Sequence, residues 1–173
     1  MNADIVKMIG NISQALLHVQ ALVTGLAYLI GLLFVIVALK KLRKIGDARA
    51  NSGSHEKIFV PLAYFLGGAV FIFLPTALIA LSRTAFGPTN ILGYTKYDPY
   101  NIYNAMKVVI QTAGLIWFVR GSVMLVHSSN PGVQEGPKGL AFIVAGILAM
   151  NFQGTIDALN YFMDYLLKLT SWV

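Results

Sequence analysis

The chain has 173 residues, of which 57% are hydrophobic and only 12% are charged, whereas a soluble domain of this length contains about a quarter charged residues. Its formal net charge of +6 does not indicate direct binding of nucleic acid. Six of the 13 basic residues lie between Lys40 and Lys57, flanked by long apolar runs, which favours a topology signal and contact with anionic phospholipid. The sequence contains no cysteine, which excludes disulfides, thiolate metal sites and cysteine nucleophiles.

The first apolar run, Leu16 to Leu39, is long enough to cross the hydrocarbon core of a membrane, which takes about 20 helical residues. It is too long for the core of a signal peptide, and its basic residues follow it instead of preceding it. Ahead of it, apolar residues recur at helical spacing. They predict either a short amphipathic helix at the membrane surface or the start of the first span itself. These residues are Ile5, Met8, Ile9, Ile12 and Leu16.

Two further spans follow. The second is predicted over Phe59 to Leu81, with Pro75 inside it, where proline kinks a helix or ends it early. The segment from Thr84 to Asn104 is rich in glycine, proline and asparagine and is predicted to form turns. The third span is predicted over Val108 to Val126.

The fourth apolar region is interrupted. Gly139 to Met150 is apolar but short, and a polar stretch from Asn151 to Thr155 separates it from an amphipathic pattern over Ile156 to Trp172. Either one long tilted helix bends at Gly154, or a span of 139–159 is followed by an interfacial helix of 156–172, which we favour. The predicted fold is therefore all-α, a single polytopic membrane helical bundle over residues 1–173 with about four transmembrane helices and short amphipathic terminal helices.

The distribution of lysine and arginine orients this bundle. The predicted loop 40–57 holds six basic residues, against three in the longer segment 83–107. We therefore expect loop 40–57 to face the cytoplasm of a bacterial inner membrane, and both termini and the linker 84–104 to face the periplasm. The candidates for contact with anionic lipid in that loop are Lys40, Lys41, Arg43 and Lys44.

Arg120 lies inside the third span, about 10 Å from its cytoplasmic end at helical rise. A charge deep in the membrane is costly, so this arginine either extends to the headgroups or pairs with carbonyls, lipid phosphate or a partner's carboxylate. At a common depth on the third and fourth spans, Gln111 is expected to pair with Asn151 or Gln153. The alternative role for these amides is a polar belt that binds a substrate.

Small residues at four-residue spacing predict close helix packing, as in the run Ala141, Ala145 and Ala149 beside Gly146. Four tyrosines recur every third residue near the end of the predicted linker. Their rings suit either the headgroup region or a partner surface. They are Tyr94, Tyr97, Tyr100 and Tyr103. No metal-ligand spacing, phosphate loop or nucleophile–base set appears in the sequence, so we expect no enzyme, no metal and no cofactor.

The third and fourth spans resemble a known family. The third contains Gln111-Thr-Ala-Gly-Leu-Ile-Trp-Phe-Val-Arg-Gly121, and the fourth contains Lys138-Gly-Leu and Ala145-Gly-Ile-Leu-Ala-Met-Asn151. Over residues 105–155 these are similar to the small multi-pass inner-membrane subunits of type IVB (Dot/Icm) secretion systems, the DotE/IcmC, DotP/IcmD and DotV group, and to the conjugation relative TraQ. The resemblance implies packing or assembly roles for Gly114, Arg120, Gly121, Gly146 and Asn151.

The resemblance also implies other inner-membrane subunits as partners, in a homo- or hetero-oligomer. The leading hypothesis is thus a non-catalytic, structural or channel-lining subunit of a secretion or conjugation complex. The alternative is a small autonomous transporter or channel. A third hypothesis is a lipid-binding scaffold that uses the basic loop.

Overall fold

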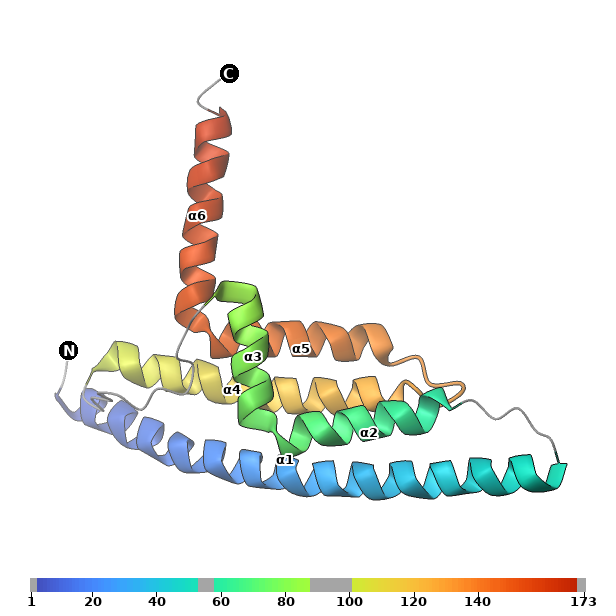
Figure 1. Ribbon diagram of the computed structural model, residues 1–173. Coiled ribbons are helices and arrows are strands. Elements are labelled where there is room, and N and C mark those ends of the chain that lie inside the picture. Colours follow the sequence, from blue (N-terminus) through green and yellow to red (C-terminus); the bar gives the residue numbers. More distant parts are fainter. Residues whose placement is uncertain (1–2, 53–57, 88–100, 171–173) are drawn as a thin grey trace.

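The computed structural model describes residues 3–52, 58–87 and 101–170. Within these ranges the chain is helical and contains no strand, as the all-α prediction requires (Figure 1). The helices are α1 (Ala3–Ser52), α2 (Phe59–Ile72), α3 (Leu74–Phe86), α4 (Ile102–His127), α5 (Gly136–Met150) and α6 (Phe152–Thr170).

The helices form two similar units. In the first unit α2 packs back along α1, and in the second α5 packs back along α4. Each returning helix then bends by 95°, into α3 in the first unit and into α6 in the second. Figure 1 shows that α1 and α4 run in the same direction, and that α3 and α6 leave their hairpins toward the same side. We call residues 3–87 the first hairpin unit and residues 101–170 the second.

Helix α1 is longer than the first predicted span. It is continuous from Ala3 to Ser52, so the N-terminal amphipathic segment belongs to the same helix as the span. The described part of predicted loop 40–57, up to Ser52, is also helical, and the prediction of a loop is wrong there. Leucine, alanine, lysine and arginine are good helix formers, and this stretch contains no proline to stop the helix. Arg43 and Asp47 lie at i,i+4 with 3.9 Å between charged atoms.

The second predicted span is broken at Phe73. Helix α2 ends at Ile72, and α3 begins at Leu74 with Pro75 in its first turn. Proline lacks an N–H, and its ring would clash with the carbonyl four residues earlier, at Phe71, if the helix were straight. Pro75 therefore ends the helix early, as predicted.

The fourth region breaks at Asn151, so the predicted span 139–159 is interrupted and no bend lies at Gly154. Asn151 has φ −100° and ψ 53°, outside helical values. The Thr155 hydroxyl lies 2.7 Å from the carbonyl oxygen of Leu148 and donates to it, which satisfies an acceptor freed by the break. Gly154 lies in the first turn of α6, where an added Cβ would meet the Asn151 side chain at 2.9 Å. Helix α5 is about 22 Å long at helical rise, shorter than a bilayer core.

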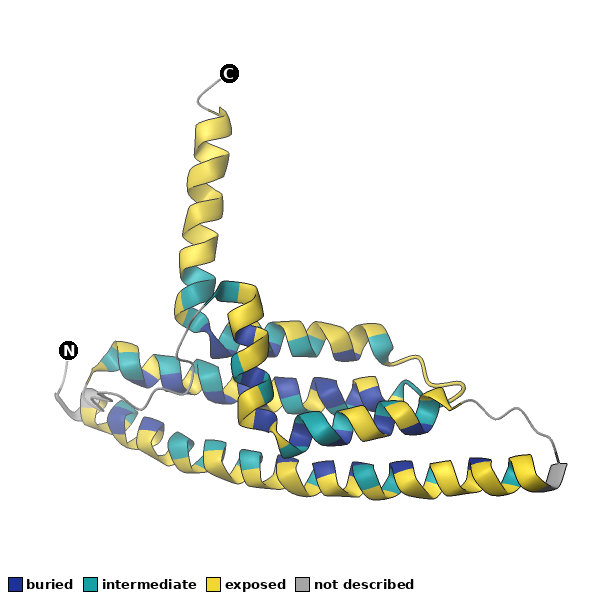
Figure 2. Ribbon diagram, in the orientation of Figure 1, coloured by how far each residue is buried: buried dark blue, intermediate teal, exposed yellow. Residues whose placement is uncertain are grey.

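The core lies between the two hairpins. Phe34 of α1 meets Tyr64 and Phe71 of α2 edge to face, with ring centroids 5.5 and 5.7 Å apart. Phe118 of α4 and Leu74 of α3 are each 1% exposed in the same cluster. Figure 2 shows these buried positions along the faces where α1, α2 and α4 meet, whereas α6 is exposed along most of its length.

Two helices, α1 and α4, are long and apolar enough to cross a membrane. The number rises to four if α2 with α3, and α5 with α6, each count as one bent span. The described part of the chain thus has the helices that membrane insertion requires.

Candidate functional site

The second hairpin is held by glycines on both helices. A Cβ at Gly114 would lie 2.9 Å from the Gly146 carbonyl oxygen, and a Cβ at Gly121 would lie 2.6 Å from that of Gly139. No larger side chain fits at these contacts, so the backbones of α4 and α5 touch. The paired glycines are seven residues apart on each helix, a spacing that keeps contact along one seam. The structure thus places Gly114, Gly121 and Gly146, three of the predicted packing residues, in one contact inside the chain.

The first hairpin has the same pattern. A Cβ at Gly31 would lie 2.9 Å from the Gly68 carbonyl oxygen, and seven residues along each helix Ala38 and Pro61 are buried. The positions correspond at an offset of 83 residues between α1 and α4 and 78 residues between α2 and α5. The second offset also superimposes Phe73 on Asn151, the two break points.

Sequence analysis missed this internal repeat, although the residues show it. Gly31-Leu-Leu-Phe34 corresponds to Gly114-Leu-Ile-Trp117, and Leu62-Ala-Tyr64 with Gly68 corresponds to Leu140-Ala-Phe142 with Gly146. Because the offset changes by five residues between the two helices of a hairpin, no single shift of the sequence aligns both.

The break between α5 and α6 is joined to α3 by a buried hydrogen bond. Asn151 Nδ2, at the break between α5 and α6, donates to Ser82 Oγ of α3 over 3.1 Å, and both residues are buried. Gln111 Nε2 of α4 donates to the Met150 carbonyl oxygen at 3.0 Å, next to the same break. We expected Gln111 to pair with a side-chain amide; in this bond its partner is a main-chain carbonyl.

A second polar contact lies beside the first. Gln20 Nε2 of α1 donates to Thr112 Oγ1 of α4 over 2.8 Å, and the Thr112 hydroxyl donates to the Val108 carbonyl at 2.7 Å. Thr112 is buried and directly follows Gln111 in the chain. Polar side chains from α1, α3, α4 and the α5–α6 break therefore form one layer, which we call the polar layer: Gln20, Ser82, Gln111, Thr112 and Asn151. Ser82 and Thr112 were not predicted, because a hydroxyl next to other polar residues gives no signal of its own.

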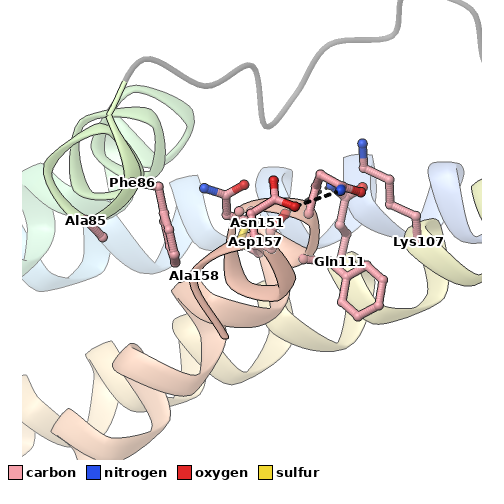
Figure 3. A pocket seen from close by; sticks show the side chains of 11 residues that line it. Ala85, Phe86, Lys107, Gln111, Asn151, Asp157 and Ala158 are labelled. Atoms are coloured by element: carbon pink, nitrogen blue, oxygen red, sulfur yellow. Dashed lines mark hydrogen bonds between the residues drawn. The ribbon is translucent and has the colours of Figure 1, made fainter. Parts of the chain in front are cut away.

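A crevice of about 550 Å³ opens beside this polar layer. Figure 3 shows Asn151 and Asp157 between Phe86 on one side and Lys107 on the other. Gln153 Nε2 donates to Asp157 Oδ1 at 3.2 Å, and Gln153 accepts a hydrogen bond from the Tyr103 hydroxyl. The lining is half polar and carries one lysine and one carboxylate. Its residues are Ala85, Phe86, Lys107, Gln111, Met150, Asn151, Phe152, Gln153, Gly154, Asp157 and Ala158.

Arg120 faces outward from the second hairpin. It is exposed, and its guanidinium carbon lies 5.3 Å from the centroid of the Phe142 ring of α5. Trp117, also exposed, meets the same ring at 6.4 Å in an edge-to-face arrangement. Arg120 is therefore separate from the polar layer, and the structure does not bring it together with Gln111, Asn151 or Gln153.

Of the four predicted tyrosines, Tyr103 alone lies in the described part of the chain. Tyr94, Tyr97 and Tyr100 lie outside the described residues. Tyr103 lies in the first turn of α4 and joins it to Gln153 of α6.

At the opposite end, Lys40, Arg43 and Lys44 are exposed on α1, whereas Lys41 is half-buried. Lys41 Nζ donates to Asn130 Oδ1 at 3.1 Å and lies 5.2 Å from the centroid of the Tyr64 ring. Lys41 thus has a packing role that the prediction of lipid contact did not include. Among the described residues, no group of three or more histidines and carboxylates is placed to hold a metal ion.

Comparison of the chain with protein-family models, with curated proteins and with solved structures gives no significant match.

Proposed function

We propose that this chain is a non-catalytic subunit of a type IVB-like secretion or conjugation complex in the bacterial inner membrane, with a structural or channel-lining role. The similarity of residues 105–155 to the small membrane subunits of those systems suggests the class. In this proposal the basic end of α1 faces the cytoplasm, following the positive-inside rule. Membrane insertion is supported by the length and apolar composition of α1 and α4.

The proposed assembly role is supported mainly by the exposure of α6. This helix of 19 residues has no buried residue within Phe152–Thr170 and stands at 95° to α5. If α5 crosses the membrane, α6 lies along its surface. One face of α6 is apolar and suits lipid, while the opposite face presents acidic and aromatic residues to water. That polar face carries Asp157, Asn160, Tyr161, Asp164 and Lys168, and we propose that it contacts neighbouring subunits.

The assembly role is tested by purifying the affinity-tagged full chain from its native membrane in a gentle detergent. The expected result is a particle much larger than the 18.8 kDa chain, containing other membrane subunits. The double variant Tyr161→Ala with Asp164→Ala should release the chain from the particle. The matched control, Arg83→Ala with Thr84→Ala, changes exposed residues of α3 and should leave the particle intact. A wild-type chain recovered as a lone monomer would rule out the assembly.

A second candidate function is an autonomous transporter or channel. It is favoured by one specific feature, the two broken helices that meet at the polar layer beside an open crevice. Broken helices in transporters place polar backbone and side chains at a binding site inside the membrane. Here the candidates are Gln111, Asn151 and Gln153. Purified protein in liposomes that moved an ion or solute, with loss of transport in Asn151→Leu, would favour this function over the assembly.

A further inference from the structure

The outer face of the second hairpin brings two cations together on an apolar surface. Arg120 directly precedes Gly121, Lys138 directly precedes Gly139, and these two glycines are in backbone contact. The two residues therefore lie about one helical turn apart along the hairpin, one on each helix, and both are exposed. Like charges on one apolar face repel each other, and an anion bound between them removes that repulsion.

A shallow groove runs along α5 beside these cations. It has a volume of about 330 Å³, and its walls are almost entirely apolar. It is lined by Lys138, Ala141 and Ala145 of α5 and by the rings of Trp117 and Phe142, which contact each other. From Lys138 to Ala145 the groove runs along the helix axis for about 10 Å. A site with a lysine at one end, an arginine beside it on the Phe142 ring and apolar walls fits a molecule with an anionic head and a hydrocarbon chain.

In the first hairpin the equivalent face is covered by protein, and its residues differ from those of the second hairpin. The positions equivalent to Arg120 and Lys138 are Val37 and Val60, and both valines pack against the core cluster. Phe34 and Tyr64, which correspond to Trp117 and Phe142, are buried there and contact His127 of the second unit. In the second hairpin the face is open, and both valine positions hold a cation. That paired change favours an anionic occupant over another apolar protein surface.

We infer that this face binds an anionic phospholipid, with its phosphate between Arg120 and Lys138 and one acyl chain along Trp117, Ala141 and Ala145. The guanidinium offers two parallel N–H donors to phosphate oxygens, and the ammonium adds a second charge. The stacked ring of Phe142 fixes the guanidinium on the side of the groove. The inference rests on the membrane insertion of the proposed function, but not on its secretion partners.

The test uses tryptophan fluorescence. The sequence has two tryptophans, so Trp172→Phe leaves Trp117, inside the groove, as the only reporter. The full chain is reconstituted in phosphatidylcholine vesicles that contain a small fraction of phosphatidylglycerol, and bromine quenchers are placed on the acyl chains of one lipid or the other. At equal mole fraction, brominated phosphatidylglycerol should be enriched at Trp117 by roughly tenfold over brominated phosphatidylcholine.

In this background, Arg120→Gln with Lys138→Gln should reduce the enrichment to about one, because no cation remains to hold the phosphate. Lys107→Gln removes a cation from the opposite end of α4 and should preserve the enrichment. Equal quenching by both lipids in the parent protein, or enrichment that survives the double substitution, would overturn the inference. Quenching by both lipids that falls equally as protein density rises would assign the face to a second copy of the chain. Absence of quenching by either lipid would show that Trp117 is outside the bilayer and would reject membrane insertion as well.

Discussion

The two hairpin units have the same backbone arrangement, but the equivalent face is buried in one unit and exposed in the other. In the first unit that face is buried, with Phe34, Tyr64 and two valines packed against the core. In the second unit it is open and carries Arg120 and Lys138. The repeated hairpin thus provides one copy that holds the molecule together and one copy whose outer face is available to the surroundings. The difference shows that a repeat can preserve backbone contacts while its outward side chains change function.

The largest expected difference in stability comes from exchanging the residues at the equivalent positions Val37 and Arg120. Val37→Arg places a cation against the core cluster and is expected to cost about 3 kcal/mol of stability or more, since leaving a polar group buried without a partner already costs about 1–3 kcal/mol and a charge costs more. The reverse change, Arg120→Val, removes an exposed side chain and should change stability by less than about 0.5 kcal/mol in zwitterionic detergent. Unfolding of both variants by denaturant measures the difference. Equal effects would mean that the two faces are not buried differently.

Glycine substitutions test whether both hairpins close by backbone contact. Gly121→Ala and Gly31→Ala each place a Cβ within 3 Å of a carbonyl oxygen of the facing helix, so each should cost about 1–3 kcal/mol. Gly25→Ala is the matched control, since nothing lies within 4 Å of its added Cβ, and it should stabilise α1 by about 0.5–1 kcal/mol. Thermal unfolding in detergent compares the three. A loss of stability in Gly25→Ala as large as that in Gly121→Ala would contradict backbone contact between the helices at Gly121.

The hydrogen bond between Asn151 at the α5–α6 break and Ser82 of α3 should show a smaller, measurable coupling. A double-mutant cycle of Asn151→Ala and Ser82→Ala is expected to give a coupling energy of about 0.6–1.7 kcal/mol, the range measured for buried hydrogen bonds in membrane proteins. Thr84, two residues from Ser82 and exposed, supplies the control, and Asn151→Ala with Thr84→Ala should be additive. Coupling in the control cycle equal to that of the test cycle would show that α3 and the α5–α6 break are not joined by this bond.

The smallest expected effect separates Lys41 from its basic neighbours. Lys41→Gln loses the hydrogen bond to Asn130 and the contact with the Tyr64 ring, which should cost about 0.5–1.5 kcal/mol. Lys40→Gln changes an exposed side chain, so its effect should stay within about 0.5 kcal/mol. The denaturant midpoints of the two variants give the comparison. Identical denaturant midpoints would show that Lys41, like Lys40, does not stabilise the fold through its contacts.

Much of the fold follows from local sequence physics. Long apolar runs located the central parts of α1 and α4, and the missing N–H of Pro75 located the break after α2. The break at Asn151 was placed too late in the sequence, because Gly154 is the poorest helix former in the polar stretch and a favoured span of 139–159 ran through it. Asn151 ends α5 through a tertiary bond to Ser82, 69 residues away in the chain, which no local pattern contains. The basic end of α1 was predicted as a loop because the charged residues were taken to end the helix. Charged residues end the part of a helix that crosses the membrane, but the helix itself can continue beyond it.

The candidate site was predictable only in part. Gly114, Gly121 and Gly146 indicated close packing, but their partners depend on how α4 and α5 are aligned. Arg120 was recognised as unusual from its depth in an apolar run, whereas its partner ring, Phe142, required the hairpin. The polar layer depends on the meeting of four segments, so single residues such as Thr112 had no signal of their own. The internal repeat could have been found by comparing each helix of a hairpin separately.

The central claim is that the second unit is a hairpin whose chain turns at Asn151 and continues as a surface helix. Because the sequence contains no cysteine, single cysteines can be introduced at each position from Gly139 to Lys168 and labelled from the aqueous phase in reconstituted protein. The account predicts protection up to Met150, followed by labelling that repeats every three to four residues along α6, strong at Asp157, Tyr161 and Asp164 and weak at Leu159 and Met163. Continuous protection through Leu159 on all faces, as for one straight span, would contradict it.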